Sequence, residues 1–176
     1  MRSKKLFFLF LLLAATPLYA EDGQGFHVGT VSGAGFAIQD GNLSGETPLS
    51  LLLELGYNFG NQLDVIGRGG YSPLLWGDTP DIQIYTYGIG IRYIFLPSSF
   101  SPYAVTLLGA YTSSSNTSGD AFFKSQTGFH NADALGIEYR FANHHSVGME
   151  FGTQIFLNDR VNLVTTIFAA AYRFTF

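Results

Sequence analysis

The chain has no cysteine among its 176 residues, which excludes disulfides, thiolate metal sites and a lipid anchor attached through cysteine. Charged residues are also scarce, because Asp, Glu, Lys and Arg together make up only 12% of the sequence. Beyond residue 20 no segment approaches the ~20 consecutive apolar residues that a transmembrane helix needs. These absences exclude a disulfide-rich domain and a helical membrane protein.

The N-terminal segment has the three parts of a secretion signal. Arg2, Lys4 and Lys5 precede an apolar run at 6–13, and small residues lead to Ala20. We predict that residues 1–20 are a cleaved signal peptide and that residues 21–176 form one domain; a retained membrane anchor is the alternative. Cleavage would remove three positive charges and change the net charge from −4 to −7. A nucleic-acid partner needs a basic surface, so none is expected.

Every second residue at the C-terminal end is aromatic or apolar: Phe168, Ala170, Tyr172, Phe174 and Phe176. The residues between them are small, polar or cationic. Side chains in a strand alternate between its two faces, so this segment has one apolar face. Because a secretion signal precedes the domain and the same pattern recurs along it, we expect the apolar face to contact lipid.

Eight segments show this alternation, at about 25–38, 49–58, 63–71, 85–95, 103–111, 135–141, 147–157 and 168–176. Most approach the ~9–11 residues that a tilted strand needs to cross a bilayer, and a sheet in lipid must close on itself. The sequence therefore predicts an all-β fold, an eight-stranded antiparallel up-and-down transmembrane β-barrel. In the fifth segment the apolar face consists of Tyr103, Val105, Leu107 and Tyr111, and this face is expected to contact lipid. A soluble carrier barrel is the alternative, but its narrow interior could not hold so many aromatic side chains.

The connections between these segments alternate in length. Those at 40–48, 72–81 and 112–122 are long, those at 60–62 and 142–145 are short, and the one at 96–102 is intermediate. The last outer connection, near 158–160, is short and breaks the trend. In outer-membrane barrels short turns face the periplasm and long loops face outwards. We therefore expect a location in the outer membrane, contact with its lipids, and both termini in the periplasm. The sequence does not identify a partner for the surface loops.

Two stretches carry a family resemblance. One is the hairpin formed by Ala134–Phe141 and Ser146–Phe151, and the other is the terminal segment Ala171–Phe176. In these the chain resembles the small outer-membrane barrel superfamily that includes the OmpA transmembrane domain, OmpX and OmpW. The resemblance implies a signal for the outer-membrane assembly machinery, formed by Phe168, Tyr172, Phe174 and Phe176. Because members differ in function, the resemblance gives a location rather than an activity.

Eight charged residues fall on the inward face of their predicted strands: Glu54, Asp64, Arg68, Arg92, Glu138, Arg140, Glu150 and Arg173. Enclosed carboxylates need cations close by. We predict that these residues form an ion-pair network that plugs the lumen; the alternative is an ion path or a gate. Which acid meets which arginine depends on the shear of the barrel, which the sequence leaves open.

The histidines raise the question of catalysis: they are His27, His130, His144 and His145. Outer-membrane barrels that deacylate lipid A carry a His-x-Ser-Asn motif, and the nearest match here runs from His130 to Asp133. Ala132 stands where the nucleophilic serine would be, and Ser125 does not restore the spacing, so an acyl acceptor is missing. No three convergent metal ligands are visible. We predict no catalytic residue, no metal and no cofactor.

One apolar cluster, at 74–76, lies inside a predicted outer loop and contains the single tryptophan. It could be an adhesive tip, a lid over the lumen or an anchor at headgroup height, and the anchor is preferred because tryptophan favours that level. The whole pattern favours a non-enzymatic outer-membrane barrel with a structural or surface-interaction role and a largely plugged polar lumen. The alternatives are a narrow channel for small or hydrophobic solutes, as the OmpW resemblance would imply, and a lipid A-modifying enzyme.

Overall fold

The computed structural model describes residues 24–39, 42–43, 47–60, 62–76, 79–115, 126–142, 144–157 and 162–176. The predicted signal peptide lies outside them. The strands are β1 (Gln24–Gln39), β2 (Asn42–Leu43), β3 (Thr47–Phe59), β4 (Leu63–Tyr71), β5 (Leu74–Trp76), β6 (Thr79–Ile94), β7 (Phe100–Ser115), β8 (Gln126–Ala142), β9 (His145–Leu157) and β10 (Asn162–Thr175). The described ranges contain no helix with the length and apolar character to span a membrane.

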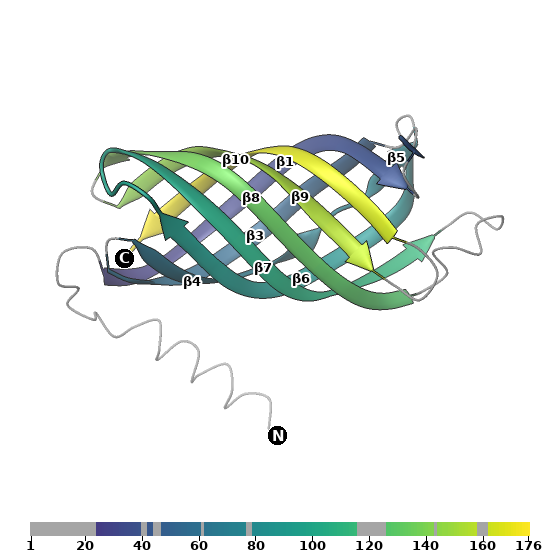
Figure 1. The fold of residues 1–176 in the computed structure, drawn as a ribbon, viewed down its shortest axis with the longest axis horizontal. Helices are drawn as coiled ribbons and strands as arrows, with labels where there is room; N and C mark the ends of the chain where they lie inside the picture. Colours follow the sequence, from purple (N-terminus) through teal and green to yellow (C-terminus); the bar gives the residue numbers. More distant parts are fainter. Residues whose placement is uncertain are drawn as a thin grey trace, which may run out of the picture.

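The eight long strands form a closed antiparallel barrel (Figure 1). Each long strand pairs with its neighbours along the chain, and β1 pairs with both β3 and β10, so the first and last strands meet. The short strands β2 and β5 add to this sheet at one end. The predicted fold class, an eight-stranded antiparallel barrel, is confirmed.

The two ends of the barrel differ. We call the end that holds Gln24 and Phe176 the terminal end, and the opposite one the distal end (Figure 1). The predicted loop at 72–81 is partly sheet, because β5 pairs with the start of β6. The predicted loop at 112–122 is also shorter, since β7 continues to Ser115. The rest of these connections, and most of 40–48, lies outside the described residues.

Side chains alternate between the outer wall and the lumen along each long strand. Leu53 and Ile89 lie on the wall, with exposed fractions of 65% and 74%. The expected facing of β7 is wrong: Tyr103, Val105, Leu107 and Tyr111 are buried in the lumen. The wall side of β7 holds only Ala104, Thr106, Leu108 and Ala110 between residues 103 and 111. Because both faces of this strand are apolar or small, hydropathy did not separate them.

Aromatic side chains surround the wall at the terminal end. The rings of Phe26 and Tyr57 lie 4.8 Å apart, and those of Phe100 and Tyr139 lie 4.7 Å apart. This band, which we call the aromatic girdle, includes the exposed residues Tyr93, Phe95, Tyr139, Phe141, Tyr172 and Phe176. Such a band suits a membrane interface.

The lumen also holds an apolar cluster towards the distal end, which we call the distal cluster. It consists of Ala37, Leu74, Ile82, Ile84, Tyr111, Phe156 and Leu163. Leu74 is 1% exposed, so the interpretation of this residue as an interfacial anchor is wrong: it packs inside the barrel. The side chain of Trp76 lies outside the described residues.

Candidate functional site

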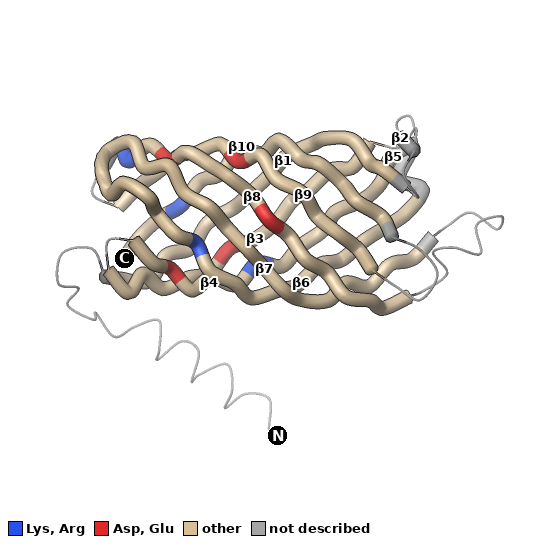
Figure 2. Tube along the Cα trace, in the orientation of Figure 1, with Lys and Arg blue, Asp and Glu red and all other residues tan. Residues whose placement is uncertain are grey.

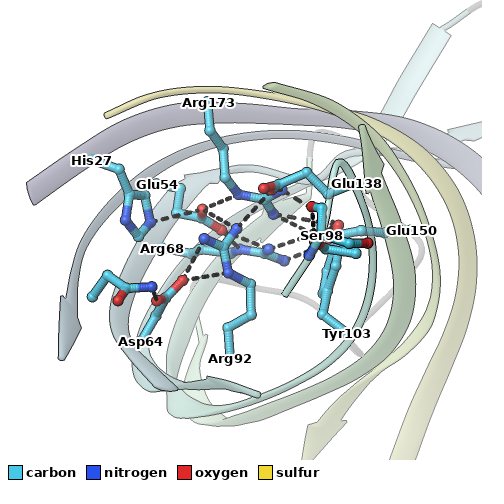
Figure 3. A network of polar contacts seen from close by, with 12 residues as sticks. His27, Glu54, Asp64, Arg68, Arg92, Ser98, Tyr103, Glu138, Glu150 and Arg173 are labelled. Atoms are coloured by element: carbon cyan, nitrogen blue, oxygen red, sulfur yellow. Dashed lines mark hydrogen bonds and ion pairs between the residues drawn. The ribbon is translucent and has the colours of Figure 1, made fainter. Parts of the chain in front are cut away.

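The charged residues that the structure describes lie mostly in the half of the barrel that holds the C-terminus (Figure 2). Inside it, one set of polar side chains crosses the lumen, and we call this set the charged layer. Its members are His27 (β1), Glu54 (β3), Asp64 and Arg68 (β4), Arg92 (β6), Tyr103 (β7), Glu138 (β8), Glu150 (β9) and Arg173 (β10). Every long strand contributes at least one member, and Figure 3 shows them pointing toward one another.

Glu54 is completely buried and accepts hydrogen bonds from two arginines. Nε of Arg173 lies 2.5 Å from its Oε1, and Nε of Arg68 lies 2.6 Å from its Oε2. Nε2 of His27 lies 3.2 Å from Oε1 of the same carboxylate. These contacts give both oxygens of Glu54 a charged or polar partner.

Glu150 is the second acid shared between arginines. Arg68 donates to it through two nitrogens, at 2.8 and 2.6 Å, and Arg173 donates through Nη2 at 2.7 Å. The hydroxyl of Tyr103 donates to the same carboxylate at 2.9 Å. Arg68 of β4 therefore joins Glu54 of the neighbouring β3 to Glu150 of β9, which lies on the opposite side of the barrel.

Arg92 connects the remaining acids. Its Nε lies 2.5 Å from Oδ2 of Asp64, and its Nη1 lies 3.2 Å from Oε2 of Glu138. Glu138 also accepts a hydrogen bond from Nη1 of Arg173 at 2.8 Å. Asn58 donates to the other oxygen of Asp64 at 2.5 Å. The four acids and three arginines thus form one continuous network.

The register of the strands and three glycines create the room for this network. Gly29 lies opposite both Glu54 and Arg173, so these two side chains meet across a strand position that has no side chain. A Cβ at Gly56 would lie 2.3 Å from Cε1 of His27, and one at Gly136 would lie 2.4 Å from Cζ of Tyr103. The ring of Tyr103 also lies beneath the guanidinium carbon of Arg173, 5.1 Å from it.

Burial raises the free-energy cost of any unpaired charge in this network. Arg173 is 2% exposed, and leaving any one of these charges without a partner inside the barrel would be costly. The geometry therefore holds charged side chains across the bore. Within the described ranges, no group of three or more His, Asp or Glu residues could hold a metal ion.

The structure brings together seven of the eight charged residues predicted for the lumen, and Arg140 is the exception. Arg140 follows Glu138 by two residues on β8, is exposed near the terminal end and belongs to none of these ion pairs. Its assignment to the network is therefore wrong, because its strand position is beyond the enclosed part of the lumen. Sequence analysis missed His27, although this residue shares its face of β1 with Gly25 and Gly29. It missed Tyr103 because it assigned the faces of β7 wrongly.

The first and last residues of the histidine motif, His130 and Asp133, lie on opposite faces of β8. His130 is buried in the lumen and stacks on Phe156, with ring centres 5.0 Å apart, whereas Asp133 is exposed on the wall. Nδ1 of His144 contacts the carbonyl oxygen of Thr175 at 2.8 Å. Nδ1 of His145 contacts the hydroxyl of Tyr172 at the same distance. Ser125 lies outside the described residues.

The C-terminal residues that the resemblance connects with assembly occupy the wall. Phe168, Tyr172 and Phe176 are exposed, and Phe174 is partly buried against Phe176, with ring centres 5.1 Å apart. They form an apolar strip along β10. Their recognition by the assembly machinery stays a prediction.

Solved structures share this fold. Neisserial surface protein A matches 89% of this chain and 100% of its own, with 18% identity and a TM-score of 0.72. The attachment invasion locus protein Ail of Yersinia pestis matches 88% and 100%, with 18% identity and a TM-score of 0.55. The outer membrane enzyme PagL matches 85% and 99%, with 17% identity and a TM-score of 0.54.

No curated protein sequence matches the chain. A family model does: the outer membrane protein beta-barrel domain matches residues 6–174. This match and the structural neighbours confirm the resemblance to small outer-membrane barrels and the location in the outer membrane. The chain belongs to the outer membrane protein beta-barrel domain family.

Proposed function

We propose that this chain is a non-enzymatic outer-membrane barrel whose lumen is closed, and which acts through its surface in a structural or interaction role. The observation that carries this proposal is the charged layer, in which side chains from all eight long strands meet across the bore. An eight-stranded barrel has an interior only just wide enough for side chains. Arginines that bridge opposite strands therefore leave no wide path for solutes.

Two further features support a closed lumen. A cavity of about 40 Å³ lies between the charged layer and the distal cluster, and its lining includes Ser50, Thr86 and Gln154. That volume has room for one or a few water molecules. On its distal side the buried rings of Tyr111 and Phe156 pack together, 5.3 Å apart. An ion would have to cross both an ion-pair network and an apolar cluster.

The absence of catalysis is supported by the facing of β8. A nucleophile and its base must lie within hydrogen-bond reach of each other. His130 lies in the lumen, Ala132 has no hydroxyl, and Asp133 lies on the opposite face of the strand. Incubating the purified protein with lipopolysaccharide and measuring released acyl chains by mass spectrometry tests this part. Protein-dependent release of an acyl chain would establish the lipid-modifying alternative.

We also propose that the terminal end faces the periplasm. Only residues 60–62 separate β3 from β4, and only residues 143–144 separate β8 from β9. Such short turns are typical of the periplasmic side. A peptide tag after Phe176 should be protected from protease in intact cells and cut after the outer membrane is opened. Cutting of this tag in intact cells would contradict the orientation.

Conductance in planar bilayers tests the closed lumen. The wild type should show little or no steady current. Arg92→Ala should raise leakage, because it removes the arginine partner of Asp64 and one of the two arginine partners of Glu138. Arg140→Ala is the matched control and should behave as the wild type. Reproducible single-channel steps from the wild type, absent from mock preparations, would instead support a narrow channel.

A further inference from the structure

The outer wall has a row of polar side chains that take no part in the charged layer of the lumen. Asp133 on β8 is exposed there and shares its face with Leu135 and Phe129. In the sheet register it lies opposite Thr106 of β7 on one side and Thr153 of β9 on the other. A carboxylate and two hydroxyls therefore lie side by side, with the apolar side chains of Leu135 and Phe151 next to them on the wall.

This row lies at membrane depth. Asp133 is six residues from Tyr139 of the aromatic girdle and four from Phe129 towards the distal end. A strand tilted by about 40° advances roughly 2.5 Å per residue along the barrel axis. Asp133 is then roughly 15 Å from Tyr139 and roughly 10 Å from Phe129 by the same strand geometry. Both distances place the carboxylate inside the apolar band, which is ~25 Å tall.

The same residues lie in a groove of about 430 Å³ on the wall. Ile91 and Tyr93 of β6 border it on one side, and Leu135 and Phe151 border it on the other. The other wall-facing side chains that line it are shorter: Ala104, Thr106, Asp133 and Thr153. The groove thus has apolar walls and a floor that offers one acid and two hydroxyls.

The carboxylate of Asp133 has no hydrogen-bond or ion-pair partner within the part of the chain that the structure describes. Its neighbour on the same face differs, because the amide of Asn131 donates to the carbonyl of Leu107 at 3.1 Å. A polar group in hydrocarbon without a partner is expensive, and the groove contains no lysine or arginine that could offset its charge. A donor from the surrounding membrane would offset this cost.

We propose that this groove binds the hydroxylated acyl chain of a membrane lipid, with the chain along the apolar walls and its hydroxyl donating to Asp133. Thr106 and Thr153 lie beside the carboxylate and can accept or donate in the same cluster. The lipid that surrounds the wall at this depth consists of acyl chains, so the occupant needs only one added donor. The interaction is binding alone, with no bond made or broken.

A second copy of this chain fits the groove less well. A symmetric contact would bring the same surface from both copies together and face one Asp133 with another. Neither copy would supply a base, since the residues that line the groove include no cation. Like charges would then meet in a medium of low dielectric constant. An acyl hydroxyl supplies the donor without a second acid.

A second groove on the wall serves as an internal comparison. Its lining includes Leu53, Leu55, Tyr87, Ile89 and Leu108, and the side chains that face it are apolar apart from the phenol of Tyr87. This groove can accommodate an ordinary acyl chain, but it has no carboxylate to which an acyl hydroxyl could donate a hydrogen bond. A substitution in this groove therefore controls for general changes in lipid contact.

Native mass spectrometry of the full-length protein tests the proposal. The probe is a lipid with a hydroxymyristoyl chain, in competition with the same lipid carrying an unhydroxylated myristoyl chain. The wild type should retain the hydroxylated lipid about threefold to tenfold better, the factor that one hydrogen bond in a membrane supplies. Asp133→Leu should lose this preference, whereas Ile89→Val in the comparison groove should keep it.

Asp133→Leu removes a polar group from the lipid face, so it should fold at least as well as the wild type. Thr106→Val and Thr153→Val provide smaller changes with the same backbone, and together they should weaken the preference. Equal retention of both lipids by the wild type would overturn the proposal. So would a stable dimer that disappears in Asp133→Leu, because it would identify a second copy as the occupant.

Discussion

Replacing Arg173 by methionine should destabilise the barrel more than the same substitution at the exposed Arg140. Arg173 donates to three carboxylates, at 2.5 Å to Glu54, 2.8 Å to Glu138 and 2.7 Å to Glu150. Methionine keeps much of the stem volume but removes the charge and all donors. The layer would then hold four acids and two arginines.

The size of the expected loss of stability depends on which arginine contacts each acid keeps after the substitution. Glu54 and Glu150 still contact Arg68, but Glu138 keeps only Arg92, at 3.2 Å. Breaking a buried pair by removing one partner costs ~3–5 kcal/mol. We therefore expect the free energy of unfolding to fall by about that amount. Adding Glu138→Gln to Arg173→Met should recover part of it, because the stranded charge is removed, and the coupling should be ~0.5–3 kcal/mol.

Urea unfolding in phospholipid vesicles, followed through the fluorescence of Trp76, measures the effect. Arg140→Met is the matched control: the same substitution at an exposed residue should change the free energy by less than ~0.5 kcal/mol. If Arg173→Met and Arg140→Met have the same stability within error, the charged layer contributes nothing to holding the barrel together, and the reasoning fails.

Three other predictions concern the wall and the glycines. Leu53→Arg places a cation on the lipid face and should cost ~2–4 kcal/mol in the same unfolding assay; a label at position 53 that reports water would refute the facing. Replacing Phe174 and Phe176 by serine should reduce the folded protein in outer-membrane fractions, and unchanged amounts would contradict an assembly signal there. Gly136→Ala pushes a Cβ into the neighbouring tyrosine ring and should cost ~1–3 kcal/mol. Gly67→Ala, with its nearest atoms 3.8 Å away, should be tolerated, and equal effects at both glycines would refute the close approach.

Alternation of side chains made the fold predictable where the two faces differ strongly. In β3 leucines face outward at 51, 53 and 55, while Glu54 faces inward, so the period of two identifies both sides. In β7 the inward Tyr103 and the outward Leu108 are both apolar, and hydropathy gave the wrong side. Tyr103 is stabilised inside the lumen by Glu150 and Arg173, which reach its hydroxyl and its ring from other strands.

The sequence pattern also predicted most members of the charged layer, but it did not predict which acid pairs with which arginine. Inward position alone selected Glu54 and Arg173, which are 119 residues apart in sequence. Their contact depends on both lying opposite Gly29, a fact of register that no local pattern contains. Arg140 has the correct face but lies nearer the opening, and the sequence carries no signal for how far the enclosed region extends.

Because Arg173 lies on the last strand, the charged layer can be completed only when the barrel closes in the correct register. While β10 pairs only with β9, Arg173 can meet Glu150, but Glu54 on β3 comes within reach only after β10 pairs with β1. A seam shifted by one residue would turn Arg173 to the wall, because neighbouring strand positions face opposite sides. A seam shifted by two would carry it ~7 Å past Glu54. Only the native register completes the network, so the ion pairs select the correctly closed barrel from the misaligned ones.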